Sequence, residues 1–122
     1  MIVLVDTSIW RRHLRTRDLQ LERLLAERRV VTHDCVLHEL ILGGLGERTR
    51  RALIALRRLR WATAEEIAAT IHRNRLAQTG VGAVDAHLFH AALDASSALY
   101  TADVALAGTF APYQPREWID QP

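Results

Sequence analysis

Short apolar runs alternate along the chain with longer segments in which apolar residues recur every three or four positions. The short runs are rich in β-branched residues, which is typical of strands that are covered on both faces, as in a parallel sheet. They predict strands at residues 2–5, 30–31 and 98–101, with a brief additional strand at residues 59–61.

The longer segments have the apolar spacing of helices that bury one face. Asp6, Thr7 and Ser8 can cap the first of them, and Thr63 followed by Glu66 forms a capping-box pattern that begins another. A first helix is predicted to carry Ile9, Trp10 and Leu14, and further helices are predicted over residues 18–28, 36–42, 47–58, 63–78 and 84–95. The tail, with Pro112 and Pro115, is expected to be irregular with at most one further strand.

This order of elements predicts an α/β protein. Strands that alternate with helices favour a single-domain α/β/α sandwich with a central parallel sheet. The length of 122 residues fits one domain, residues 1–122, and no linker, repeat or low-complexity segment divides the chain.

Composition excludes several classes of protein. No apolar run approaches the ~20 residues that span a bilayer, and residues 1–5 lack the features of a secretory signal. We therefore expect a cytoplasmic protein with no membrane partner. Cys35 is the only cysteine, so an intramolecular disulfide and a thiolate metal cluster are both excluded.

All sixteen basic residues are arginines, and lysine is absent. Mechanisms that require a lysine, such as a P-loop or a Schiff base, are thereby excluded. Arginine grips phosphate groups through a planar fork, although a bias in codon usage explains the same composition equally well. Arg11 and Arg12, which follow Asp6 closely, are the preferred contacts for RNA phosphates.

Four acidic residues are predicted to meet at one edge of the sheet. Asp6 and Asp103 come directly after predicted strands, and ligands bind at the carboxyl ends of parallel strands. Asp85 and Glu39 lie in the first and second turns of helices that begin at that same edge. Each acid alone is also explained as a helix cap or a charge favoured by the helix dipole.

Electrostatics indicates what these acids hold. Two unit charges about 5 Å apart repel by roughly 3 kcal/mol at an effective dielectric near 20, so four carboxylates need either protons or a cation. Ligand sets made only of oxygen favour Mg²⁺ or Mn²⁺. Such an ion assists the attack of water on a phosphodiester.

The segments around the four acids resemble PIN-domain proteins, and most closely VapC-type toxins of toxin–antitoxin pairs. They read VDTSIW at Asp6, VLHEL at Glu39, VDAHL at Asp85 and YTAD at Asp103, and together they extend over essentially the whole chain. The resemblance implies a PIN-like fold and Mg²⁺- or Mn²⁺-dependent cleavage of RNA. It also implies a VapB-type antitoxin as partner and a homodimer as the usual unit.

Residue roles follow from the same resemblance. Asp6, Asp85 and Asp103 would hold metal, with Glu39 as a further ligand or as the base that orients water. The hydroxyl residues Thr7, Ser8 and Thr101 would support this pocket, although turn and cap roles account for each of them singly.

Three alternatives are open at this stage. A haloacid-type phosphatase also begins with a strand and an aspartate, but it needs an acid where Ser8 stands, and a lysine. A non-catalytic PIN-like module would bind RNA or protein without turnover. His87 and His90, three residues apart on one predicted helix, have a spacing that can bind a transition metal, but a second pair of ligands is not apparent.

Overall fold

A computed structural model describes residues 1–121 of the chain. The elements are, in order, β1 (Val3–Val5), α1 (Thr7–Arg15), α2 (Leu19–Ala26), β2 (Val30–Val31), α3 (Asp34–Leu42), α4 (Glu47–Ile54), α5 (Ala64–Arg73), α6 (Ala83–Asp94), β3 (Ala98–Tyr100), α7 (Val104–Phe110), the 3₁₀-helix η1 (Ala111–Tyr113) and α8 (Arg116–Ile119).

The three strands form a parallel sheet in the order β2-β1-β3. Val3 is in register with Val30 on one side and with Ala98 on the other. Residues Val3–Val5 are completely buried, as expected for a central strand made only of apolar residues. The predicted strands at residues 2–5, 30–31 and 98–101 are thus confirmed, each to within one residue at its ends.

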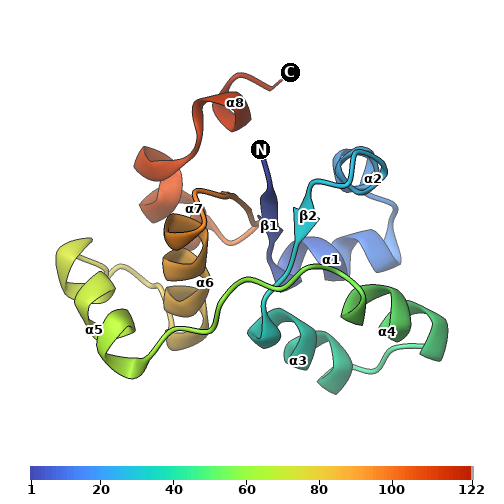
Figure 1. The fold of residues 1–122 in the computed structure, drawn as a ribbon, viewed down its shortest axis with the longest axis horizontal. Coiled ribbons are helices and arrows are strands. Elements are labelled where there is room, and N and C mark those ends of the chain that lie inside the picture. The colour runs from blue at the N-terminus through green and yellow to red at the C-terminus, as the bar shows by residue number, and fades with distance from the viewer. Residues whose placement is uncertain (122) are drawn as a thin grey trace.

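Helices lie on both sides of this sheet, which gives an α/β/α arrangement (Figure 1). In the view of Figure 1, α6 and α7 lie to the left of the strands, and α1 and α2 lie to the right. Leu88 and Phe89 of α6 and Leu106 of α7 are completely buried in the core beside the strands. Burying each such side chain contributes about 1.5–3 kcal/mol to folding. The PIN-like α/β/α fold predicted from the sequence is confirmed.

The brief strand predicted at residues 59–61 is wrong. The chain there makes one isolated parallel bridge, between Thr32 and Arg58, through hydrogen bonds of Thr32 N to Arg57 O and Leu59 N to Thr32 O. Pairing stops after this bridge because His33, the next residue on the other side, already caps α3.

Two helices are shorter than predicted. The helix predicted over residues 47–58 ends at Ile54, because residues 57–59 are needed for the bridge to Thr32. The helix predicted over residues 63–78 ends at Arg73, since Asn74 caps it and Arg75 takes the left-handed conformation, with φ of 54°.

The tail is more ordered than predicted. It forms α7, η1 and α8, and no strand occurs between residues 101 and 121. The exposed edge of β3 is covered in another way: the side-chain amide of Gln114 accepts from Leu99 N at 3.1 Å and donates to Leu99 O at 2.7 Å. A single side chain therefore satisfies the backbone groups that a further strand would have paired.

None of the helices described for residues 1–121 has the length and apolar character that crossing a bilayer requires.

Candidate active site

The four predicted acids line one cavity of about 410 Å³ at the carboxyl edge of the sheet. Its wall is completed by hydroxyl residues, one arginine and the start of α6. The lining residues are Asp6, Thr7, Ser8, Arg11, Glu39, Gly82, Ala83, Val84, Asp85 and Asp103. The predicted convergence of these side chains from distant segments is therefore what the fold produces.

Asp6 is the most firmly held of the four acids. It follows β1 directly, is only 6% exposed, and caps α1 by accepting from Thr7 N at 2.7 Å through Oδ1. Its other oxygen, Oδ2, accepts from the hydroxyls of Ser8 at 2.9 Å and Thr101 at 2.7 Å. These three hydrogen bonds to one carboxylate fix its orientation.

Asp103 is tied to the same hydrogen-bond network. Its backbone N–H donates to Thr101 Oγ1 at 3.0 Å, and the N–H of Ala102 donates to Ser8 Oγ, also at 3.0 Å. Asp103 Oδ1 caps α7 by accepting from Leu106 N at 2.9 Å. Asp6 and Asp103 thus each cap a helix and also line the cavity.

Glu39 reaches the cavity from the second turn of α3. Its Oε1 accepts from the hydroxyl of Thr7 at 2.9 Å. Thr7 lies beside Asp6 at the start of α1, and α1 packs against α3. The hydroxyls of Thr7, Ser8 and Thr101 therefore all orient acidic side chains of the cavity, as a supporting role requires.

Asp85, in the first turn of α6, is partly buried. Burial raises the pKa of Asp85 above its usual value, and the charges of Asp6 and Asp103 raise it further, while a hydrogen bond with the backbone of Gly82 acts in the opposite direction. The nearby negative charges thus add to the effect of burial in disfavouring the ionised form of Asp85.

The distribution of ion pairs leads to the same conclusion. Within residues 1–121, every acidic residue except the four site acids and Glu65 forms an ion pair with an arginine. Examples are Asp18 with Arg12 and Glu66 with Arg60. In a chain with sixteen arginines, the cavity keeps four carboxylates without a cationic partner within 4 Å.

The acids share a cavity without forming a closed ligand set. Over the described residues, no three His, Cys, Asp or Glu side chains are grouped as a metal centre. The donor set nevertheless consists of carboxylate and hydroxyl oxygens, which are the ligands that hard divalent cations prefer.

The two arginines predicted to contact RNA differ in position. Arg11 lines the cavity. Arg12 instead donates to Asp18 Oδ2 at 2.8 Å and to the hydroxyl of Tyr100 at 3.2 Å. The sequence could not distinguish the position of Arg11 from that of Arg12, because the partners of Arg12 are distant: Asp18 is the N-cap of α2, and Tyr100 lies in β3.

His87 and His90 do not share a site. His90 Nδ1 lies 2.6 Å from the hydroxyl of Thr70 on α5, whereas the ring of His87 stacks on Trp61 at a centroid distance of 5.1 Å. Trp61 also stacks on His33. This group was not predicted from the sequence, since its members are far apart in the chain and the only signal was an aromatic residue in a segment interpreted as a strand.

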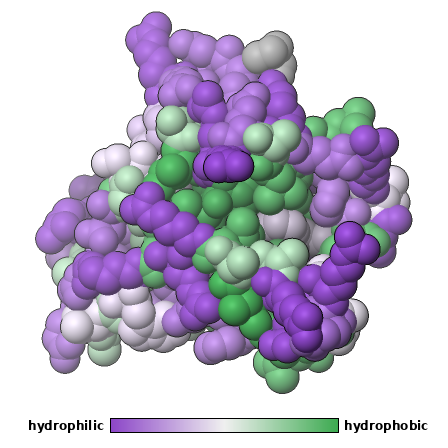
Figure 2. All heavy atoms as spheres, turned by 45° about the vertical axis from the view of Figure 1, so that its right-hand side comes forward, coloured by the Kyte–Doolittle hydropathy of each residue, from purple (hydrophilic) through white to green (hydrophobic). Residues whose placement is uncertain are grey.

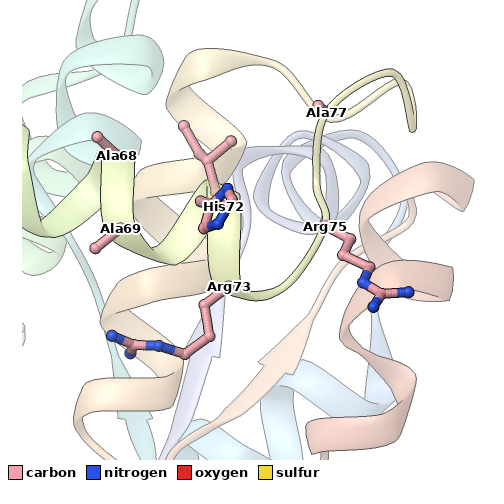
Figure 3. A pocket seen from close by; sticks show the side chains of 7 residues that line it. Ala68, Ala69, His72, Arg73, Arg75 and Ala77 are labelled. Carbon is pink, nitrogen blue, oxygen red and sulfur yellow. The ribbon is translucent and has the colours of Figure 1, made fainter.

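Further hollows lie away from the four acids. One of about 860 Å³ is at the end of α5 and is lined by Ala68, Ala69, Ile71, His72, Arg73, Arg75 and Ala77 (Figure 3). Arg73 and Arg75 extend to opposite sides of His72 there, and no acid lines the hollow. It is larger than the acidic cavity but lacks a set of groups that could do chemistry together.

Another hollow, about 320 Å³, is mainly apolar and lies between α1, α2 and α4. Its lining includes Trp10, Leu14, Leu25, Leu53 and Leu56. In Figure 2, turned toward this side of the molecule, hydrophobic atoms gather in the centre of the face and hydrophilic ones surround them.

The protein is an α/β/α sandwich with a parallel sheet. Four carboxylates lie in one cavity at the carboxyl edge of this sheet. This arrangement defines a PIN-like domain with an acidic site.

Comparison with known proteins identifies the family. No protein-family model matches the chain. The chain is 37% identical over 108 residues to Ribonuclease VapC32 of Mycobacterium tuberculosis strain CDC 1551 / Oshkosh, an alignment that covers 86% of this chain and 87% of that protein. The Ribonuclease VapC32 of strain ATCC 25618 / H37Rv matches to the same extent. The chain belongs to the VapC family, which confirms the resemblance seen in the sequence.

Proposed function

We propose that this protein is a metal-dependent endoribonuclease, the toxin of a VapBC-type toxin–antitoxin system. The observation that carries the proposal is the cavity in which Asp6, Glu39, Asp85 and Asp103 meet without an arginine partner. The relatives named Ribonuclease VapC32 support RNA as the substrate.

The residues of the cavity fit Mg²⁺ or Mn²⁺. Asp6, Asp85 and Asp103 would hold the ion, with Glu39 beside them. A bound divalent cation polarises a phosphoryl oxygen, lowers the pKa of a bound water and offsets charge on the leaving oxygen. The pKa of Asp85, raised first by burial and then by the charges of Asp6 and Asp103, supports this assignment, because a cation would offset the contribution of those charges.

The protein's own groups would then position the reactants. Asp6 cannot rotate freely, since three donors hold it. Glu39, held through one oxygen by Thr7, keeps Oε2 available to accept a proton from the attacking water. Arg11, at the wall of the cavity, is placed to bind a phosphate beside the one that is cleaved.

We further propose a cytoplasmic location, a VapB-type antitoxin as partner, and a homodimer as the basic unit. The apolar hollow between α1, α2 and α4 supports the proposal of an antitoxin partner, because an amphipathic helix of that partner could cover the hollow with its apolar side chains.

The nuclease proposal is tested by cleavage of a single-stranded RNA in Mg²⁺ and in Mn²⁺ by the wild type, Asp6→Asn and Glu65→Gln. Asp6→Asn should reduce kcat at least about a hundred-fold, as expected when a metal ligand is lost. Glu65→Gln changes an acid outside the cavity that, within residues 1–121, forms no ion pair with an arginine, and this variant should cleave normally.

Excess chelator should abolish cleavage by the wild type. Full activity of Asp6→Asn, or of the wild type in chelator, would contradict the mechanism. A non-catalytic RNA- or protein-binding module would instead show no metal-dependent turnover in any of the three proteins.

A further inference from the structure

Three aromatic rings from distant segments form one cluster, which we call the tryptophan platform: His33, Trp61 and His87. His33 is the N-cap of α3, Trp61 lies between α4 and α5, and His87 is in α6. The centroid of the Trp61 ring system lies 4.9 Å from that of His33 and 5.1 Å from that of His87, and both ring pairs are inclined by 27°.

Both histidines lie on the same face of the indole. Rings stacked on opposite faces would each lie about 3.5 Å from the plane of the indole, so their centroids would be about 7 Å apart or more, whereas those of His33 and His87 are 6.2 Å apart. Trp61 is 52% exposed in spite of these contacts. Its other face is therefore open to solvent.

The indole is also fixed in place before any ligand arrives. Its segment is anchored by buried Leu59 on one side and buried Ala62 on the other. Arg60, between them, forms ion pairs with Glu66 and with Asp94. A ring held in this way loses little conformational entropy when a ligand stacks on it.

His33 is equally well fixed. It is 1% exposed, and its Nδ1 accepts a hydrogen bond from Cys35 N at 3.0 Å. Burial lowers the pKa of His33, so the ring is neutral near pH 7 and presents an uncharged surface to the indole.

The platform lies at the same edge of the sheet as the acidic cavity. His33 follows Thr32 beyond the carboxyl end of β2, and His87 is two residues beyond Asp85 on α6. The wall of the cavity formed by Glu39 and Asp85 belongs to the same two helices, α3 and α6, that carry the histidines.

We propose that the open face of Trp61 stacks against a base of single-stranded RNA, a few nucleotides from the phosphate that is cleaved. Bases of unpaired RNA are recognised by stacking on aromatic side chains, and every base offers a flat face. The proposal rests on the proposed nuclease function, because RNA that binds in the acidic cavity would cross the carboxyl edge of the sheet, where Trp61 also lies.

RNA fits the surroundings of Trp61 better than a second protein subunit does. The exposed neighbours along the chain are Arg60 and Thr63, which are polar, so the indole is not part of a continuous apolar patch in its own segment. A single flat aromatic face among polar side chains matches a nucleobase, whereas subunit contacts bury wider apolar areas.

The test measures the Kd of a fluorescently labelled single-stranded RNA for the wild type, Trp61→Ala and Trp61→Phe over a series of salt concentrations in chelator, where the RNA stays intact. Trp61→Ala should weaken binding about ten-fold or more, the loss expected for one stacked base, and Trp61→Phe should recover most of it. The slope of log Kd against log salt should not change, because no charge is removed.

Tyr113→Ala is the matched control. Tyr113 is 42% exposed and lines a hollow with Ser96 and Ser97, which precede β3 and so lie at the opposite edge of the sheet. This variant should bind RNA as the wild type does. Light scattering on all four proteins reports the oligomeric state.

A second arm places the change in the RNA. An RNA series with one abasic nucleotide moved along the strand should show one position where the wild type binds weakly and where Trp61→Ala shows no further loss. No such position, or an unchanged Kd for folded Trp61→Ala, would overturn the platform. So would a change of oligomeric state that accounts for the lost affinity, since Trp61 would then be a subunit contact.

Failure of the platform and failure of the nuclease proposal are distinguishable. If the wild type cleaves RNA with metal while Trp61→Ala binds it equally well, only the platform is contradicted. If the wild type neither binds nor cleaves RNA, both proposals fail.

Discussion

One hydroxyl, that of Thr101, connects two of the acids in the cavity. It donates to Asp6 Oδ2 at 2.7 Å and accepts from the backbone N–H of Asp103 at 3.0 Å. It therefore fixes the orientation of one carboxylate and the backbone position of the other. Groups that orient metal ligands in this way affect activity almost as strongly as the ligands themselves.

Replacing Thr101 with Val keeps the shape of the side chain but removes both hydrogen bonds. We expect kcat to fall by about ten-fold or more, with KM for RNA nearly unchanged, because Asp6 loses one of its donors while the phosphate contacts remain. Steady-state cleavage at fixed Mg²⁺ measures both constants. Thr101→Ser keeps the hydroxyl and should retain most of the activity; equal loss in the two variants would show that the methyl group, rather than the hydrogen bonds, matters.

At the level of single residues, the acids could be predicted and the arginines could not. Asp6 stands directly after β1, Asp103 lies between the end of β3 and the start of α7, and Asp85 lies at a helix start, so topology alone places them. Arg12 follows the same strand as Arg11, but its position depends on Asp18 and Tyr100. Tyr100 is 88 residues away, and no local pattern reports such a contact.

Asp18 holds three elements together. It caps α2 by accepting from Leu21 N, it accepts from Arg12 of α1, and it accepts from the hydroxyl of Tyr100 in β3. Burial on its own would raise the pKa of Asp18, but the hydrogen bonds from Leu21, Arg12 and Tyr100 outweigh it and hold the pKa below the usual value. Since the folded state binds the proton less tightly than the unfolded state, the ionised carboxylate stabilises the fold.

The stabilisation by Asp18 should therefore be present above its unfolded pKa, about 3.9, and should disappear as the pH falls through the lower folded value. Asp18→Asn keeps an oxygen for the helix cap but loses the charge. We expect the free energy of unfolding of this variant to be about 1 kcal/mol lower than that of the wild type at pH 7.

Urea unfolding of the wild type and of Asp18→Asn, from pH 7 down to pH 2, measures the difference between their free energies of unfolding. The contributions of other titrating groups cancel in this difference. The difference should shrink progressively below about pH 4. A difference that stayed constant down to pH 2 would show that the charge of Asp18 contributes nothing.

At the level of elements, the sequence predicted where helices and strands begin better than where they end. Starts carry local signals, such as Asp6 before α1 and the Thr63–Glu66 capping box before α5. The end of α4 is set instead by the bridge between Arg58 and Thr32, and the edge of β3 is closed by Gln114. Both depend on tertiary contacts that a local pattern does not contain.

The arrangement of charge over the whole molecule separates the cavity from the rest of the surface. Across residues 1–121, arginines neutralise the acids outside the site, apart from Glu65, and leave the four carboxylates of the cavity unpaired. The α/β/α fold and the site edge followed from the order of the elements. The pairing of charges did not, because it depends on the packed positions of long side chains.

The proposed nuclease mechanism depends on Asp6, Asp85 and Asp103 binding a divalent cation together. The most direct measurement is an anomalous difference map from a crystal grown with Mn²⁺. We expect a peak inside the cavity, with oxygens of these three residues about 2.1–2.2 Å from it, and with no comparable peak at that place in Asp6→Asn. A wild-type map with no peak in the cavity, or with Mn²⁺ bound only elsewhere on the molecule, would contradict this mechanism.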